Sequence, residues 1–175
     1  MGSLSPAWYA DGVLPTIPKG EQMDTIQVAE AVESKLHDIL DSKGGDPYEL
    51  AGAQLYGVSF GEKGEPVLDH IAQHPDVYDL LDNDTNARVA NGYFYTLVVT
   101  TGWAAPLNAN GEVEGAPSQH ALRRRVRLAV VANRESVASV LRFQDEPNEP
   151  ITDPGDATGS LADAIRTFVK AGATD

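Results

Sequence analysis

The sequence contains no cysteine, which excludes disulfide bonds, thiolate metal sites and cysteine nucleophiles. It has no apolar run of the roughly 18 residues that a transmembrane helix needs, and its start lacks the basic and apolar segments of a signal peptide. It also lacks the G-x-G-x-x-G and Walker A motifs that bind nucleotide phosphates. We therefore expect a cytoplasmic protein that contacts no membrane and uses no cofactor.

Positive charge is also scarce in this chain. There are 13 lysine and arginine residues against 26 aspartate and glutamate residues, which gives a formal net charge of -13. Such a charge opposes binding to nucleic acid and favours basic partners. Six of the eight arginines lie between residues 123 and 142, so the positive charge is concentrated in one part of the chain while the acidic residues are spread over the rest.

The segment 93–143 is the richest in residues that form strands. It reads as three strands in series, at residues 93–103, 120–132 and 135–143, with β-branched and aromatic residues that suit a pleated surface. Both faces of the first of these strands are apolar, so we expect it to be central and covered on both sides. Three consecutive antiparallel strands form a meander, which indicates an α+β fold.

The rest of the chain supplies cover for this sheet. A helix over residues 24–43 is indicated by the capping-box spacing of Asp24 and Gln27 and by an apolar stripe of helical period. We also expect a strand at residues 50–60 and two short helices, at residues 66–72 and 75–81, that begin at Pro66 and Pro75. An acidic loop at residues 144–157 and a final helix at residues 160–170 follow. This order is similar to PAS, GAF, profilin and roadblock layouts. It predicts a single α+β domain over residues 23–175.

Residues 1–22 form a distinct N-terminal segment. They contain three prolines and show neither a helical nor a strand period, yet they include the large apolar residues Trp8, Tyr9 and Leu14. A solvated tail rarely carries so many apolar groups. We expect an extended arm that packs on its own domain or on a neighbouring subunit.

The arginines of the second and third predicted strands form the most unusual cluster. Alternation places Arg123, Arg125 and Arg127 on one face, and Arg142 of the neighbouring strand can join them. One interpretation is structural, with the arginines paired to acids or covering the sheet with their aliphatic stems. The other is a recognition surface for an acidic partner or an anionic ligand.

Three further patterns suggest chemistry less directly. Gly57-Val58-Ser59-Phe60-Gly61 matches the G-x-S-x-G nucleophile elbow, and Asp69 and His120 could complete a triad, but no helix is expected after Gly61. His70 and His74 would share a helix face and could bind zinc, although a third ligand is missing. The acids Asp145, Glu146, Glu149, Asp153 and Asp156 match no calcium loop, so no metal site is expected.

An aromatic pair offers a possible ligand site. Trp103 stands where the first meander strand enters a long loop, and Tyr78 lies in one of the short predicted helices. A pocket between the sheet and the short helices near these two residues would make the chain a small-ligand-binding domain of sensory type.

Several stretches resemble a group of proteins from high-GC Gram-positive bacteria and their phages. They are Thr101-Gly102-Trp103-Ala104-Ala105-Pro106-Leu107, Pro117-Ser118-Gln119-His120, Arg123-Arg124-Arg125-Val126-Arg127-Leu128, Ser139-Val140-Leu141-Arg142-Phe143 and Leu161-Ala162-Asp163-Ala164. The resemblance implies no activity and no functional residue. If it extends to phages, the chain would work within a virion rather than free in the cytoplasm.

Three hypotheses follow. The first is a non-enzymatic interaction or assembly module that binds a protein partner or a second copy of itself. Its expected contact residues are Trp8, Tyr9, Leu14, Arg123, Arg125, Arg127 and Arg142. The second is the sensory-type ligand-binding domain with Tyr78 and Trp103 at its pocket. The third, a serine hydrolase that uses Ser59, ranks last because the elbow lacks its helix.

Overall fold

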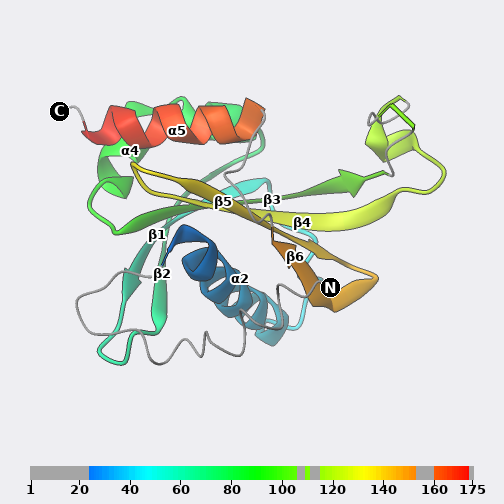
Figure 1. Ribbon diagram of the computed structural model, residues 1–175, viewed down its shortest axis with the longest axis horizontal. Helices are drawn as coiled ribbons and strands as arrows, with labels where there is room; N and C mark the ends of the chain where they lie inside the picture. Colours follow the sequence, from blue (N-terminus) through cyan, green and yellow to red (C-terminus); the bar gives the residue numbers. More distant parts are fainter. Residues whose placement is uncertain (1–23, 106–108, 111–114, 153–159, 174–175) are drawn as a thin grey trace.

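The fold is built on one open antiparallel sheet, seen in a computed structural model of the chain (Figure 1). The structure describes residues 24–105, 109–110, 115–152 and 160–173. The strand order is β2-β1-β3-β4-β5-β6. In chain order β1 to β6 span Ala53–Phe60, Pro66–His74, Tyr95–Ala104, Arg124–Ala132, Val137–Phe143 and Glu146–Thr152. The predicted α+β class and the predicted meander are confirmed, and the meander continues into β6.

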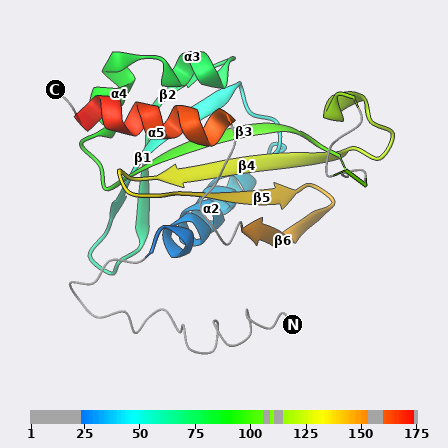
Figure 2. The ribbon, with the colours of Figure 1, turned by 45° about the horizontal axis from the view of Figure 1, so that its top comes forward.

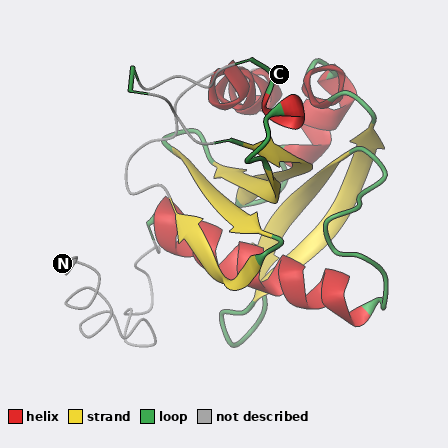
Figure 3. Cartoon of the chain, turned by 90° about the vertical axis from the view of Figure 1, so that its right-hand side faces the viewer, coloured by secondary structure: helices red, strands yellow, loops and turns green. Residues whose placement is uncertain are grey.

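Helices cover both faces of the sheet, as Figures 2 and 3 show. Helix α2 (Thr25–Ser42) crosses one face, which we call the α2 face. On the other face, the α5 face, lie α3 (Val77–Leu81), α4 (Asp84–Ala90) and α5 (Ser160–Ala173). A short 3-10 helix, η2 (Pro117–Gln119), precedes β4. The predicted cover by an N-terminal and a C-terminal helix is therefore confirmed.

Helix α2 begins where the sequence predicts. The Asp24 carboxylate accepts from the backbone N–H groups of Ile26 and Gln27, and the Gln27 side chain accepts from the Asp24 N–H in return. This capping box satisfies N–H groups that the first turn of a helix leaves without partners. The side chains Val28, Val32 and Leu36 then bury one stripe of the helix against the sheet.

The period-2 alternation of the strands divides the apolar residues into two cores. In β3, Leu97 and Val99 face α2, whereas Val98 faces α5. All three are at most 1% exposed. The expectation that this strand is central and covered on both sides is thus confirmed, and β3 lies between β1 and β4 in the sheet.

The helix predicted from Pro66 is wrong, because residues 66–74 form strand β2. Apolar residues at 67, 68, 71 and 72 suggested a helical spacing. The structure shows a bulge instead: Tyr56 pairs with His70 and Leu55 pairs with Ala72, so Ile71 has no partner in β1. The extra residue breaks the alternation that would have identified the strand. Pro66 is tolerated as the first residue of an edge strand, where a missing N–H costs little.

Two elements were missing from the prediction. Helix α4 follows Asn83, whose side chain caps it, and its inner face consists of the alanines Ala87 and Ala90, which give a weak hydrophobic signal. Strand β6 lies inside the segment predicted as an acidic loop, and it contains Pro147 and Pro150. An edge strand accepts prolines that a central strand would not. The proposed arm, with Trp8, Tyr9 and Leu14, lies outside the described residues. None of the described helices has the length and apolarity needed to cross a membrane.

Helices α4 and α5 approach closely at Gly172, and this contact generates a prediction. A Cβ at Gly172 would lie 2.2 Å from the backbone oxygen of Ala87, too close for any real contact. Gly172→Ala should therefore lower the free energy of unfolding by about 1–3 kcal/mol, despite the higher helix propensity of alanine. The measurement is urea denaturation.

Gly45→Ala is the matched control, because a Cβ there meets nothing within 4 Å and the backbone φ is not positive. It should leave the stability unchanged or raise it by up to about 1 kcal/mol. Equal effects of the two substitutions would contradict the close packing of α4 on α5.

Candidate functional site

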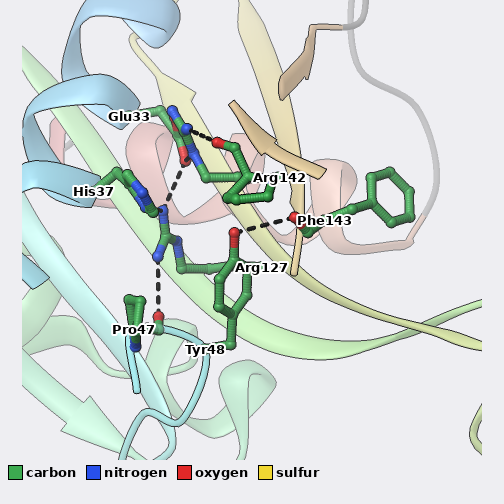
Figure 4. Close-up of polar contacts among 8 residues, drawn as sticks. Glu33, His37, Pro47, Tyr48, Arg127, Arg142 and Phe143 are labelled. Carbon is green, nitrogen blue, oxygen red and sulfur yellow. Dashed lines mark hydrogen bonds and ion pairs between the residues drawn. The ribbon is translucent and has the colours of Figure 1, made fainter. Parts of the chain in front are cut away.

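A buried ion network lies between α2 and the sheet (Figure 4). Glu33 of α2 is 1% exposed, Arg127 of β4 is 0% exposed and Arg142 of β5 is 6% exposed. Arg142 binds the Glu33 carboxylate with two nitrogens, Nε at 2.8 Å and Nη2 at 2.5 Å. Arg127 Nη2 donates to the same carboxylate at 3.0 Å. One carboxylate therefore serves two guanidinium groups.

The strand register explains why this carboxylate is needed. Arg127 and Arg142 are direct cross-strand partners on the same face of the sheet. Two like charges in this arrangement repel each other, and burial strengthens the repulsion because the interior screens charge poorly. Glu33 projects from α2 to both guanidinium groups. It holds them together, and the guanidinium groups in turn keep the buried acid ionised.

The network also anchors the loop that follows α2, residues 43–52. Arg127 Nη1 donates to the Pro47 carbonyl at 2.9 Å, and its Cζ lies 5.1 Å from the centroid of the Tyr48 ring. The Tyr48 hydroxyl donates to the Phe143 carbonyl at 3.2 Å, and Arg125 Nη2 donates to the Tyr48 carbonyl at 3.0 Å. We call this segment the anchored loop. Arginines of β4 thus fix a loop that has no secondary structure of its own.

His37 completes the network and has a defined protonation state. Its Nδ1 lies 2.9 Å from Arg127 Nη2. A guanidinium can only donate, so Nδ1 accepts and the ring is neutral with its proton on Nε2. Burial lowers the pKa of His37, and the charges of Arg142 and Arg127 lower it further against the opposing effects of Glu33 and Asp41.

Burial alone would raise the pKa of Glu33, but its bonds to Arg142 and Arg127 outweigh burial and hold the pKa below its usual value. In the folded chain the network therefore consists of one carboxylate, two guanidinium groups and one neutral imidazole. The sequence reasoning missed Glu33, His37 and Tyr48. The available signal was an acid at position 33, inside the apolar stripe of α2 and between Val32 and Leu36.

Of the other arginines of the predicted cluster, Arg123 is exposed and Arg125 is half-buried. Trp103, at the end of β3, is 38% exposed. Its ring centroid lies 5.1 Å from Arg123 Cζ and 5.2 Å from Arg125 Cζ. Leu122, which precedes Arg123 in the chain, is 67% exposed. We call Trp103, Leu122, Arg123 and Arg125 the Trp103 surface. It stands at the end of the long β3–β4 hairpin, on the right in Figure 1.

Charge neutralisation differs between the two faces of this hairpin. Arg124, on the opposite face, pairs with Asp145 and Glu146 at 2.6 Å each. Among the described residues, neither Arg123 nor Arg125 forms an ion pair with a carboxylate. The Trp103 surface therefore carries two positive charges on a chain whose net charge is -13.

A groove runs between α2 and β6, with a volume of about 650 Å³. We call it the α2–β6 groove. Its floor includes Glu33 and Arg142, whose charges already meet in the ion network. Its walls carry the carboxylates Glu30 and Asp38, and burial raises the pKa of Glu30. Neutral polar groups complete the lining, from Gln27, Ser34, Asn148 and Thr152.

The predicted aromatic pair does not share a cavity. Tyr78 lies in α3 on the α5 face, where its hydroxyl is 2.8 Å from Ser160 Oγ. Trp103 lies on the α2 face by the alternation of β3, with Arg125 as its cross-strand partner. The α2–β6 groove includes neither residue, and neither does a smaller cavity of about 270 Å³ near α4.

Ser59, His70 and His74 lie on strands rather than on the nucleophile elbow and the helix that the sequence patterns require. Ser59 lies near the end of β1, and the chain turns after Phe60 into β2 rather than into a helix. His70 and His74 lie on strand β2, where His70 Nε2 is 2.7 Å from Gln54 Oε1. Within the described ranges, no group of three or more histidine, aspartate or glutamate residues could hold a metal ion.

Fold and site together define an α+β domain with a buried ion network and a cationic, aromatic surface at one end of its sheet. Comparison with known proteins adds no relative: no family model, no curated protein and no solved structure matches the chain.

The ion network predicts that Glu33 is critical for stability. Glu33→Gln would leave two buried guanidinium groups facing a neutral amide, and breaking a buried ion pair in this way costs about 3–5 kcal/mol. Urea denaturation should show a loss of this size. Glu30→Gln makes the same change on the same helix at a half-buried position, so it should change the stability by about 0.5 kcal/mol or less. If Glu33→Gln and Glu30→Gln changed the free energy of unfolding by the same small amount, the stability of the fold would not depend on Glu33.

His37 predicts a loss of stability in mild acid. Its pKa is lower in the folded chain than in the unfolded chain, where it is about 6.5. Its contribution is therefore fully present above about pH 6.5 and is lost as the pH falls toward the folded value. Urea denaturation at pH 7.5 and 5.5 should show this loss in the wild type. His37→Asn should reduce it, because an amide oxygen can accept from Arg127 without titrating.

His120→Asn serves as the control, because His120 lies outside the ion network and its ring nitrogen Nδ1 accepts from the backbone N–H of Leu122. It should keep the wild-type pH dependence. If His37→Asn kept it as well, the assignment of this pH dependence to His37 would be wrong.

Proposed function

We propose that this chain is a non-enzymatic protein-interaction module that binds an acidic protein surface through Trp103, Arg123 and Arg125. The observation that carries the proposal is the exposed ring of Trp103, which lies 5.1 and 5.2 Å from two guanidinium groups that have no carboxylate partner in the described part of the chain. We also propose that the module serves assemblies of the bacterial or phage type that the sequence resemblance suggests.

The composition of the Trp103 surface supports this function. Tryptophan and arginine are the residues that most often dominate binding energy at protein interfaces. A guanidinium that stacks on the face of an indole ring still has N–H groups along its edge. A carboxylate can accept hydrogen bonds from these groups. A single contact surface can therefore offer an apolar ring and two charged donors together.

The surface is also partly ordered before binding. Arg125 donates to the Tyr48 carbonyl of the anchored loop and stacks on Trp103 at the same time. Fixing a long side chain in advance lowers the entropy that binding must overcome. The ion network contributes indirectly, because Arg127 holds the same loop through Pro47.

The charge of the Trp103 surface determines which partner it binds more than the net charge of the whole chain does. At physiological ionic strength, charges are screened beyond about 8 Å. The acidic remainder of the chain therefore opposes approach from a distance, whereas contact with the Trp103 surface is governed by its two arginines. The two alternative functions have less support, because Tyr78 and Trp103 lie on opposite faces and no helix follows Ser59.

The test uses a fluorescently labelled glutamate-rich peptide as a model acidic surface, with binding followed by anisotropy at about 0.1 M salt. Trp103→Ala should weaken binding by about thirtyfold, as expected for loss of an interface residue worth about 2 kcal/mol. Phe94→Ala is the matched control, because Phe94 is an aromatic residue that is 65% exposed. It immediately precedes β3, whereas Trp103 lies near the other end of that strand.

Substitution of single arginines tests the contribution of positive charge to peptide binding. Arg123→Ala should weaken peptide binding and reduce its dependence on salt, whereas Arg134→Ala, at an exposed arginine in the β4–β5 turn, should do neither. If the wild type bound the peptide no more tightly than Trp103→Ala, the proposed function would be wrong.

A further inference from the structure

We infer that the acidic surface bound by the Trp103 surface is the α2–β6 groove of a second copy of this chain. The inference rests on the proposed function and names its partner. The contact joins two different surfaces, so it would link copies head to tail.

The groove has the charge that the Trp103 surface lacks. Glu33 on its floor is shared between Arg142 and Arg127, so the ion network has no negative charge to spare, and Glu30 and Asp38 are the other carboxylates of the lining. Two carboxylates face two guanidinium groups across the proposed contact. Charge-assisted hydrogen bonds of this kind are stronger than neutral ones.

The groove also has the size and the lining for an aromatic side chain. Its volume of about 650 Å³ lies within the range of pockets that enclose small molecules, so it has room for an indole ring with an adjoining guanidinium group. Pro150 is exposed and supplies apolar contact, and Asn148 supplies hydrogen-bonding groups at the edge.

The two surfaces occupy different parts of the molecule. The Trp103 surface ends the β3–β4 hairpin, which extends beyond helices α2 to α5 (Figures 1 and 2). The groove is lined instead by residues of α2, β5 and β6. A contact between unlike surfaces leaves one of each free on every dimer. Further copies can therefore add, and the product is a ring or an open chain rather than a closed two-fold dimer.

The experiment uses two variants of the full chain at physiological salt, with mass measured by light scattering after size exclusion. The first, Trp103→Ala with Arg123→Glu, removes the Trp103 surface and keeps the groove. The second, Glu30→Lys with Asp38→Lys, reverses the groove and keeps the Trp103 surface. Each variant alone should be a monomer, whereas the wild type should form larger species whose mass rises with concentration.

An equimolar mixture of the two variants should give a dimer that does not grow further, because only one intact pair of surfaces remains. The matched control is Glu62→Lys with Glu135→Lys, which makes the same change in net charge at exposed positions outside the groove and should associate like the wild type. Glu30→Gln with Asp38→Asn provides a milder groove variant and should weaken association by about tenfold.

The results that overturn the inference are distinct from those that overturn the proposed function. A groove variant that associates like the wild type, or a mixture that stays monomeric, rules out the groove. A wild type that stays monomeric while it binds the glutamate-rich peptide through Trp103 rules out the second copy as partner and leaves the proposed function standing. A wild-type chain that neither binds the peptide nor self-associates would overturn both the inference and the proposed function.

Discussion

The position of Glu33 between two arginines is the constraint on which the α2 face depends. Arg127 and Arg142 are buried cross-strand neighbours, and both pair with the Glu33 carboxylate of α2. Helix α2 must therefore cross the sheet with Glu33 directly over them. A buried ion pair of this kind specifies position more than it adds stability, because the cost of burying the charges offsets much of their attraction.

The same arginines connect the interior with the surface. Arg127 binds Glu33 and His37 on one side and the Pro47 carbonyl on the other, and Arg125 joins the next carbonyl of that loop to Trp103. Adjacent odd positions of one strand thus belong to the buried ion network and to the Trp103 surface. The order of the anchored loop and the order of the Trp103 surface have a common source in the register of β4.

Much of this architecture could be predicted from the sequence, and the failures have physical causes. Alternation in β3, β4 and β5 and the capping box of α2 are local signals. The central sheet, the α+β class of the fold and the shared face of the four arginines could therefore be predicted. The bulge at Ile71 shifted the alternation of β2, and the alanines of α4 gave little contrast. The partner of the arginines lies 94 residues from Arg127, and no local pattern joins Glu33 to it.

The two outer strands limit how this domain can be joined to anything else. On one side, Pro147 and Pro150 remove N–H groups from β6, and on the other side the bulge at Ile71 distorts β2. A regular row of backbone donors and acceptors is what allows a foreign strand to extend a sheet, and prolines and bulges are common means of preventing it. Any association of this domain would then proceed through side chains, which respond to salt and to single substitutions. The sheet itself is protected against the irreversible growth of β-structure from copy to copy.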